Sequence, residues 1–218
     1  MNLNKNNLEV IKAASNEASR YQLNSIHITK DFTECTNGHI LARMSYPKQF
    51  DSEDLPATVK TGKKEDIIPF AVPVDGLKGI KFPKKVSLPV LADLYVDVDY
   101  TNSNGNSRFG MTDLQTTTSP EIRKIEGEYP ATEAVIPTGE PIFEISLDGR
   151  YLSTLALIAA GLNVREGGIT LKFYGFNHPA VITAHNDEQE FKGLIMPMEG
   201  DARDLTKKEE PVEDNETF

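Results

Sequence analysis

The stretch PIFEISLDGRYLSTLALIAAGLN (141–163) changes its hydrophobic period part-way along, and this change indicates the fold class. Its first residues have the composition of a strand. Apolar residues then recur at spacings of three and four, which predicts an amphipathic helix. The apolar face of this helix consists of Leu152, Leu155, Ala159 and Leu162. Gly161 lies near the predicted end of the helix, and Asn163 is suited to terminate it.

Three strands are predicted after this helix, in GITLKFYG (168–175), PAVITAHN (179–186) and EFKGLIMPM (190–198). In the last of them Pro197 cannot donate a hydrogen bond to a neighbouring strand, so the strand ends here or lies at a sheet edge. The apolar residues around Pro197 fit two alternatives. They form either a buried core strand or an exposed surface, rich in adaptable methionine, on which other proteins dock.

The same order of elements is predicted twice more, upstream. The expected elements are a helix over 6–20 with strands over 26–29 and 33–46, then a strand and short helix in 67–83 with strands over 92–100 and 108–118. A strand–helix–three-strand repeat thus occurs three times, at about 1–60, 66–128 and 140–198, although the first leading strand is poorly defined. Because each repeat must cover a helix stripe and a sheet face, we expect paired repeats in layered α+β domains.

Composition places the chain among ordinary globular proteins and favours a cytoplasmic location. It has 218 residues, 39% of them hydrophobic, and a net charge of −10. No apolar run approaches the roughly 20 residues of a membrane span, and the polar N-terminus is unlike a signal peptide. Cys35 has no cysteine partner, which predicts a core thiol in a reducing compartment. Residues 199–218 are acidic and lack apolar periodicity, which predicts a disordered tail.

The sequence offers little support for an enzyme, a metal site or a cofactor. The stretch DVDYTNSNGN (97–106) fails as a calcium loop because Tyr100 would fill the first ligand place, and we expect a hairpin connection there. The four histidines lack zinc-ligand spacing, and no phosphate-binding glycine loop or nucleophile elbow is present. An unrelated α+β enzyme stays open as an alternative, because catalytic groups are assembled in space.

Basic residues on the predicted helices suggest a second kind of surface. An acidic chain coats nucleic acid poorly as a whole, but a local positive face can still contact phosphates. The candidates for such a DNA-facing surface are Lys12, Arg20, Lys78, Lys81 and Arg150. Ordinary solvated surface charge is the alternative for each of them.

Four motifs resemble, in order, signatures of the bacterial DNA polymerase III beta subunit, the replication sliding clamp. They are SRYQLNSIHI (19–28), TNGHILA (36–42), EYPATEAVIP (128–137) and GLIMPM (193–198). The resemblance covers most of residues 8–198 and implies a DNA-clamp fold, with sheets outside and helices inside. By this resemblance residues 1–130 correspond to the clamp's middle domain, and 138–198 to the last repeat of its final domain.

The resemblance also implies a hydrophobic cleft that binds short peptides of polymerases and other partner proteins. Carried over by position, its lining consists of Leu23, Thr36, Gly38, His39, Leu41, Pro130, Val135, Leu194, Met196, Pro197 and Met198. A groove of aliphatic and methionine side chains suits aromatic and leucine anchors. Two positions depart from the family pattern: Asn37 replaces the usual aspartate and Ile40 the usual arginine, so the peptide preference is expected to differ.

The length departs further from the family. A family member has three domains of two repeats each, and two chains close a ring around duplex DNA. With three repeats, we expect this chain to be a homo-oligomer, a dimer or a tetrameric ring, in which third repeats pair about a two-fold axis. The expected function is a non-enzymatic processivity factor that encircles DNA and docks partner peptides. The alternative is a clamp-like decoy that binds such peptides, or a host clamp, without encircling DNA.

Overall fold

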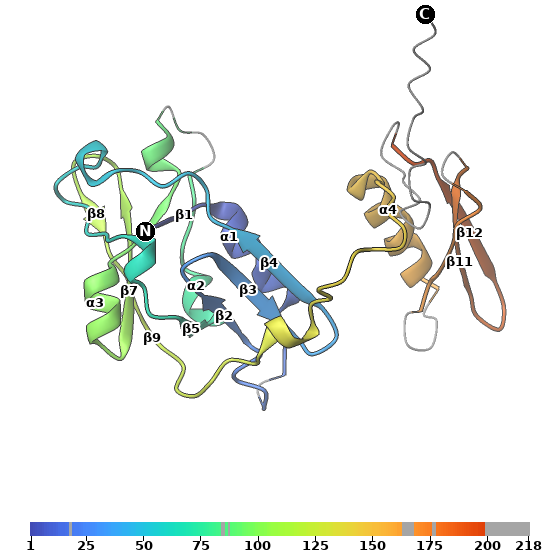
Figure 1. The fold of residues 1–218 in the computed structure, drawn as a ribbon, viewed down its shortest axis with the longest axis horizontal. Coiled ribbons are helices and arrows are strands. Elements are labelled where there is room, and N and C mark those ends of the chain that lie inside the picture. The colour runs from blue at the N-terminus through green and yellow to red at the C-terminus, as the bar shows by residue number, and fades with distance from the viewer. Residues whose placement is uncertain (18, 84–85, 87, 163–167, 176–177, 199–218) are drawn as a thin grey trace, which may run out of the picture. The chain divides into compact units, whose positions relative to one another are not determined.

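The computed structural model describes residues 1–17, 19–83, 86, 88–162, 168–175 and 178–198. Two compact units divide the chain, unit 1 over Met1–Ile136 and unit 2 over Pro137–Phe218 (Figure 1). The predicted acidic tail over 199–218 and the predicted terminator Asn163 lie outside the described residues. No helix in the described part of the chain is long and apolar enough to cross a membrane.

Unit 1 contains two antiparallel sheets. One has the order β4-β3-β2-β5 and is built from β2 (Ser25–Ile28), β3 (Phe32–Thr36), β4 (Leu41–Ser45) and β5 (Phe70–Pro73). The other has the order β1-β6-β7-β8, with β9 also paired to β7. Its strands are β1 (Asn2–Leu3), β6 (Leu94–Val96), β7 (Asn106–Thr112), β8 (Thr117–Thr118) and β9 (Glu121–Arg123).

Short helices connect these strands. The α-helices are α1 (Lys5–Glu9), α2 (Val74–Leu77) and α3 (Val98–Ser103). Single turns of 3-10 helix are η1 (Val10–Ala13), η2 (Ser52–Asp54), η3 (Lys64–Asp66), η4 (Pro89–Leu91) and η5 (Thr132–Val135). The connection from β4 to β5 contains only such turns, as its polar sequence predicts.

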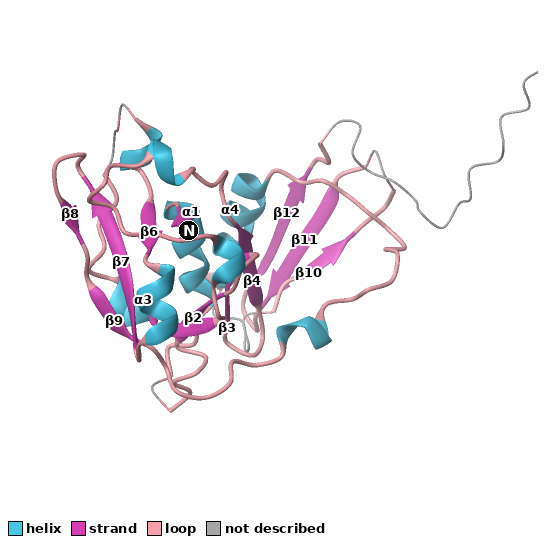
Figure 2. Cartoon of the chain, turned by 60° about the vertical axis from the view of Figure 1, so that its left-hand side comes forward, coloured by secondary structure: helices cyan, strands magenta, loops and turns pink. Residues whose placement is uncertain are grey.

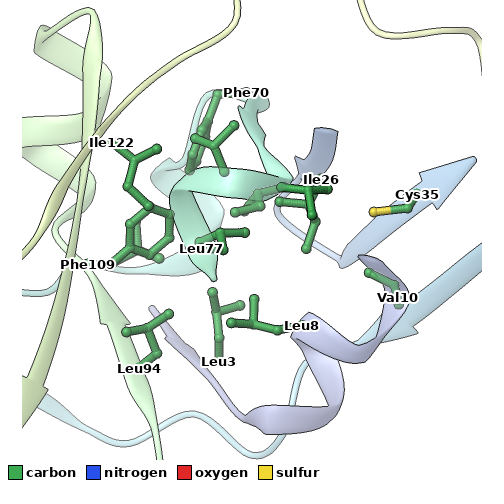
Figure 3. Close-up of a cluster of buried hydrophobic side chains, with 14 of the residues drawn as sticks. Leu3, Leu8, Val10, Ile26, Cys35, Phe70, Leu77, Leu94, Phe109 and Ile122 are labelled. Atoms are coloured by element: carbon green, nitrogen blue, oxygen red, sulfur yellow. The ribbon is translucent and has the colours of Figure 1, made fainter. Parts of the chain in front are cut away.

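The core of unit 1 gathers apolar side chains from both sheets and from the helices. Leu3, Ile26, Leu94 and Phe109 are completely buried in it. Figure 3 shows Leu8 of α1 and Leu77 of α2 directed into the same cluster. Cys35 is also completely buried, and burial raises the pKa of its thiol to about 12. The prediction of a core thiol is therefore confirmed.

Two predictions for unit 1 are wrong. The helix predicted over 6–20 covers only α1 and η1, because Ala14 adopts an extended backbone and the Ser15 N–H donates to Leu23 C=O instead. The strand predicted over 92–100 ends at Val96, because the Asp97 side chain caps the N-terminus of α3. The segment 97–106 still connects the antiparallel neighbours β6 and β7, as expected, but it contains helix α3.

Unit 2 consists of one helix packed on one antiparallel sheet. Its elements are α4 (Gly149–Ala160), β10 (Thr170–Lys172), β11 (Ala180–His185) and β12 (Glu190–Ile195), with the sheet order β10-β11-β12 (Figure 2). Helix α4 lies against β11 and β12, and its predicted apolar face buries Ala159 completely. Gly193 permits this close packing, since a Cβ there would lie 3.0 Å from Leu155 Cδ2.

The strand predicted at the start of unit 2, before α4, does not form as a regular element. Within 141–147 only Glu144 makes an isolated bridge. Asp148 then caps α4 through the backbone N–H of Arg150. The three strands after the helix are confirmed, and β12 ends at Ile195 at a sheet edge, as Pro197 predicts.

Candidate functional site

The motif at 36–42 forms the hairpin between β3 and β4, in which Thr36 lies opposite Leu41. The Asn37 side chain closes the loop by accepting hydrogen bonds from the backbone N–H groups of His39 and Ile40, at 2.9 and 3.0 Å. Gly38 has φ +92°, a backbone conformation that is costly for residues with a Cβ. Asparagine and glycine at these two positions therefore fix the loop that carries the predicted cleft residue His39.

A buried carboxylate lies behind this hairpin. Glu34 on β3 is 1% exposed and is opposite Arg43 on β4. Arg43 donates to it through Nε and Nη2, at 3.1 and 2.8 Å. His27 Nδ1 lies 2.9 Å from one carboxylate oxygen, and the Thr132 hydroxyl lies 3.0 and 2.9 Å from the two oxygens. Three side chains, from β2, β4 and η5, thus converge on one charge.

This network holds the segment 128–136 against the sheet. Arg43 also pairs with Glu133 at 2.7 Å, and the Tyr129 ring stacks on His27 with a centroid distance of 4.4 Å. Two predicted cleft residues, Pro130 and Val135, lie on this segment and are exposed, Val135 by 72%. The network leaves these apolar side chains at the surface of unit 1.

Electrostatics favour the ionised form of Glu34. Burial alone would raise the pKa of this carboxyl, but the hydrogen bonds from His27, Arg43 and Thr132 outweigh burial and lower the pKa below its usual value of 4.5. A charge that is both buried and fully hydrogen-bonded is a fixed structural element of the fold.

Two further predicted cleft residues of unit 1 lie on the hairpin and in the turn before β2. Thr36 is buried, and its hydroxyl donates to the Ile40 carbonyl at 2.7 Å. Leu23 lies half-buried in the turn before β2. The Arg20 guanidinium approaches the loop, because a Cβ at Gly38 would lie 3.8 Å from Arg20 Nη1. Arg20 was expected on a helix, and it lies in this turn instead.

In unit 2 the motif at 193–198 exposes its apolar side chains. Leu194, Met196 and Met198 are 61%, 60% and 50% exposed, whereas Ile195 is buried in the core. Alternation along the strand thus places one row of apolar side chains outside and another inside. The backbone N–H of Met198 donates to Ser146 C=O at 2.9 Å, which fixes the chain beyond Pro197. The core-strand alternative for the outer row is wrong.

Four of the five predicted DNA-facing residues pair with an acidic neighbour in the sequence. Their partners are Glu9 for Lys12, Glu17 for Arg20, Asp75 for Lys78 and Asp148 for Arg150. Hydrogen bonds from Arg150 lower the pKa of Asp148 to about 2. Lys81 is exposed and has no ion pair among the described residues. Each local pair weakens the positive field that phosphates would feel.

Comparison with solved structures identifies the fold. The beta chain of DNA polymerase III from Streptococcus pneumoniae matches 90% of this chain at a TM-score of 0.61 and 19% identity. The chain has the fold of a bacterial sliding clamp. The beta subunit from Streptococcus pyogenes matches 91% of it at 0.62 and 16% identity, and a sliding clamp from Pseudomonas aeruginosa matches 90% at 0.57 and 18%. No family model and no curated protein matches the sequence.

The chain spans about half the length of these clamps, since it covers 48% of the S. pneumoniae structure and 50% of the other two. The predicted α+β clamp fold is thus confirmed, on half of a clamp's length. The predicted cleft residues fall into two sets, one on the hairpin, turn and 128–136 segment of unit 1, and one on β12 and the residues after it in unit 2.

Sequence reasoning missed the residues that position the unit 1 set. The hairpin motif gave only a partial signal for the pair Glu34 and Arg43, because a two-residue Asn-Gly turn at 37–38 would place Glu34 opposite Leu41, whereas the four-residue loop 37–40 places it opposite Arg43. No comparable signal exists for Thr132, which follows Glu34 by 98 residues in the sequence.

Proposed function

We propose that this clamp-fold chain is a non-enzymatic docking platform for short peptides of DNA polymerases and related partner proteins. The observation that carries the proposal is the exposed apolar row Leu194, Met196 and Met198, which lies in the motif that resembles the last strand of the clamp cleft. Exposed apolar rows are unfavourable in water unless a partner covers them. The unit 1 set, with exposed Val135 on an anchored segment, is a second apolar set that the motif resemblance assigns to peptide docking.

The size and flexibility of these side chains suit peptide binding. Methionine adapts its shape to varied partners, and a hydrophobic groove accepts the aromatic and leucine anchors of a linear peptide. His39 is exposed on the hairpin loop and offers a polar contact at the rim. With Ile40 exposed where the family usually has arginine, we expect this rim to prefer less acidic peptides.

Fluorescence anisotropy with a labelled peptide of the Gln-Leu-x-Leu-Phe type tests this proposal. Saturable binding to the wild type should be lost in a Met196→Ala/Met198→Ala variant. The matched control is Ile68→Ala/Leu88→Ala, which truncates two equally apolar, exposed side chains of unit 1 outside the predicted cleft. Equal losses in both variants, or no binding to the wild type, would contradict peptide docking at this row.

The second part of the proposal concerns DNA. An oligomer of this chain that closes a ring would encircle duplex DNA without base-specific contacts, with Lys12, Arg20, Lys78, Lys81 and Arg150 facing the phosphates. Replacing Lys12, Lys78 and Lys81 together by alanine should weaken retention on duplex DNA and leave peptide affinity intact. Loss of peptide affinity in that variant would show that the two faces are assigned wrongly.

One observation favours a second candidate function, a clamp-like decoy. The local ion pairs of Lys12, Arg20, Lys78 and Arg150, on a chain of net charge −10, leave little net positive charge for DNA. A decoy would bind clamp-interacting peptides, or a host clamp, with no retention on DNA. Peptide affinity and DNA retention measured on the same preparation separate the two functions.

A further inference from the structure

The two halves of unit 1 complete each other's sheets by exchanging strands. Strand β1 precedes α1 in the first half, but it pairs with β6 of the second half. Strand β5 precedes α2 in the second half, but it pairs with β2 of the first. Strand β5 thus extends the set β2, β3 and β4 next to β2, and β1 extends the sheet of β6 and β7 next to β6.

The register of this exchange is the same in both directions. The residue just before the helix N-cap lies opposite an apolar residue of the receiving strand. Leu3, before the N-cap Asn4, lies opposite Leu94, and Val72, before the N-cap Pro73, lies opposite Ile26. All four apolar residues are completely buried. The exchange therefore supplies the centre of the unit 1 core.

Each leading strand also contacts the end of its own half. The Gln49 side chain, which follows β4, hydrogen-bonds the backbone N–H and C=O of Asn2 at 2.9 and 3.1 Å. Ile125, which follows β9, donates its N–H to Ala71 C=O at 2.8 Å. In unit 2, Met198 follows β12 and donates to Ser146 C=O at 2.9 Å. The segment 142–147 thus has the same relation to its own repeat as β1 and β5 have to theirs.

Unit 2 lacks the other half of this arrangement. Its sheet has three described strands, and β10 forms one edge, with all three of its residues exposed. On the helix side of the sheet Leu171 and Phe173 remain 40% and 44% exposed. Helix α4 adds Tyr151 and Ile158, which are 64% and 53% exposed at a helical spacing of seven residues. The Phe143 ring lies 5.6 Å from that of Phe173, and beyond this contact these side chains form an exposed apolar face of unit 2.

We propose that a second copy of this chain covers this face, with unit 2 of each copy donating the segment 142–147 to the β10 edge of the other. The exchange seen inside unit 1 then recurs between two chains about a two-fold axis, and the two α4 helices pack together. This exchange specifies how the homo-oligomer of the proposed function would assemble. It rests on the proposed function only where it is linked to the encirclement of DNA. It does not depend on peptide binding.

The unit 1 register specifies the contacts. Leu147 precedes the N-cap Asp148 and lies opposite Leu171 of the other copy, which places Ile145 opposite Phe173 on the same apolar face. Ser146 then lies opposite Lys172 on the outer face. Glu144, two residues earlier on that face, becomes a diagonal neighbour of Lys172, so the donated segment and the receiving edge carry complementary charges.

The mass in solution gives the first test. Light scattering on the full chain at micromolar concentration should give twice the 24.2 kDa of one chain, or four times if a ring closes. Ile158→Asp buries a charge in the proposed helix contact and should reduce the mass to that of one chain. Ile68→Asp places the same charge at an isoleucine of unit 1 that is 61% exposed, against 53% for Ile158, and should leave the mass unchanged. A wild-type mass of one chain would overturn the inference.

A cysteine pair tests the register without disturbing the core. Opposite residues of paired strands have Cα atoms about 5 Å apart, within disulfide reach. Ser146→Cys/Lys172→Cys should therefore form a covalent dimer under mild oxidation, and buried Cys35 should not interfere. The control pair Ser146→Cys/Lys192→Cys uses β12, at the opposite edge of the sheet, and should stay uncrosslinked. Equal cross-linking of both pairs, or none for the first, would overturn the exchange.

These results are independent of peptide docking. A monomeric Ile158→Asp variant that still binds the labelled peptide, beside a dimeric wild type, supports both proposals. A monomeric wild type that binds peptide overturns the strand exchange alone, and a cross-linked dimer that binds no peptide overturns the docking function alone.

Discussion

The hydroxyl of Thr132 lies 3.0 and 2.9 Å from the two carboxylate oxygens of Glu34, and both residues are buried. The same hydroxyl accepts a hydrogen bond of 3.1 Å from Arg43 Nη2. One small side chain therefore connects a charge on β3 and a cation on β4 to the segment that carries Pro130 and Val135. The wall of the proposed cleft in unit 1 is held by a polar network as well as by apolar packing.

Removing the charge at the centre of this network should destabilise the fold. Glu34→Gln keeps the size of the side chain but loses charge-assisted hydrogen bonds to Arg43 and His27, and we expect about 2 kcal/mol less free energy of unfolding. Urea unfolding followed by circular dichroism measures this change. Glu133→Gln is the matched control, because it removes an Arg43 partner that is 72% exposed, and it should cost far less. Equal effects would show that burial of Glu34 is irrelevant.

The same carboxylate should make the stability of the protein depend on pH. Because the folded-state pKa of Glu34 is lowered, its contribution is present above the unfolded value of 4.5 and is lost as pH falls through the folded pKa. Melting temperatures measured from neutral pH into the acid range should fall more steeply for the wild type than for Glu34→Gln. Parallel curves for the two proteins would mean that Glu34 does not ionise differently on folding.

Local sequence pattern predicted the elements of unit 2 better than those of unit 1. Helix α4 has a full apolar stripe, a cap at Asp148 and Gly161 at its end, so sequence-local signals agree. The first predicted helix has a similar spacing of apolar residues, but Ala14 adopts an extended backbone and the Ser15 N–H donates to the Leu23 carbonyl, so the helix ends there. Asp97 ended a strand that alternation alone would continue. Turn and cap chemistry overrode hydrophobic period in both cases.

The candidate site was predictable only in part for a related reason. Motif resemblance selected the hairpin, the 128–137 segment and the GLIMPM strand, and the exposure of Met196 and Met198 agrees with the docking alternative. The supporting contacts depend on pairings across the fold, such as Glu34 with Thr132, which no local pattern encodes. Likewise, the acidic partners of Lys12 and Lys78 were visible in the sequence, but their effect on a positive face depends on whether the side chains meet in the fold.

Gly38 gives a prediction about the hairpin that carries His39. Its φ of +92° means that Gly38→Ala should lower the free energy of unfolding by about 1 kcal/mol and shift the loop backbone. Gly105→Ala is the control, because Gly105 has an ordinary φ and open space around its Cβ direction. Chemical denaturation measures the stability difference, and peptide anisotropy reports the loop. A fully tolerated Gly38→Ala would mean that the loop adopts another turn.

The ion pairs around the predicted DNA-facing residues lead to a prediction that separates ring from decoy. Glu9, Glu17 and Asp75 each pair with one of these basic residues at a spacing of three residues. Replacing them by Gln, Gln and Asn frees three cations, so a face that already contacts DNA should bind duplex more tightly, with a steeper dependence on salt. Anisotropy with a labelled duplex at several salt concentrations measures both quantities. The control Asp51→Asn/Glu53→Gln/Asp54→Asn changes the net charge equally at other exposed sites of unit 1. Equal gains in the two variants would indicate a general charge effect, and the proposed DNA-facing surface would then lose its support.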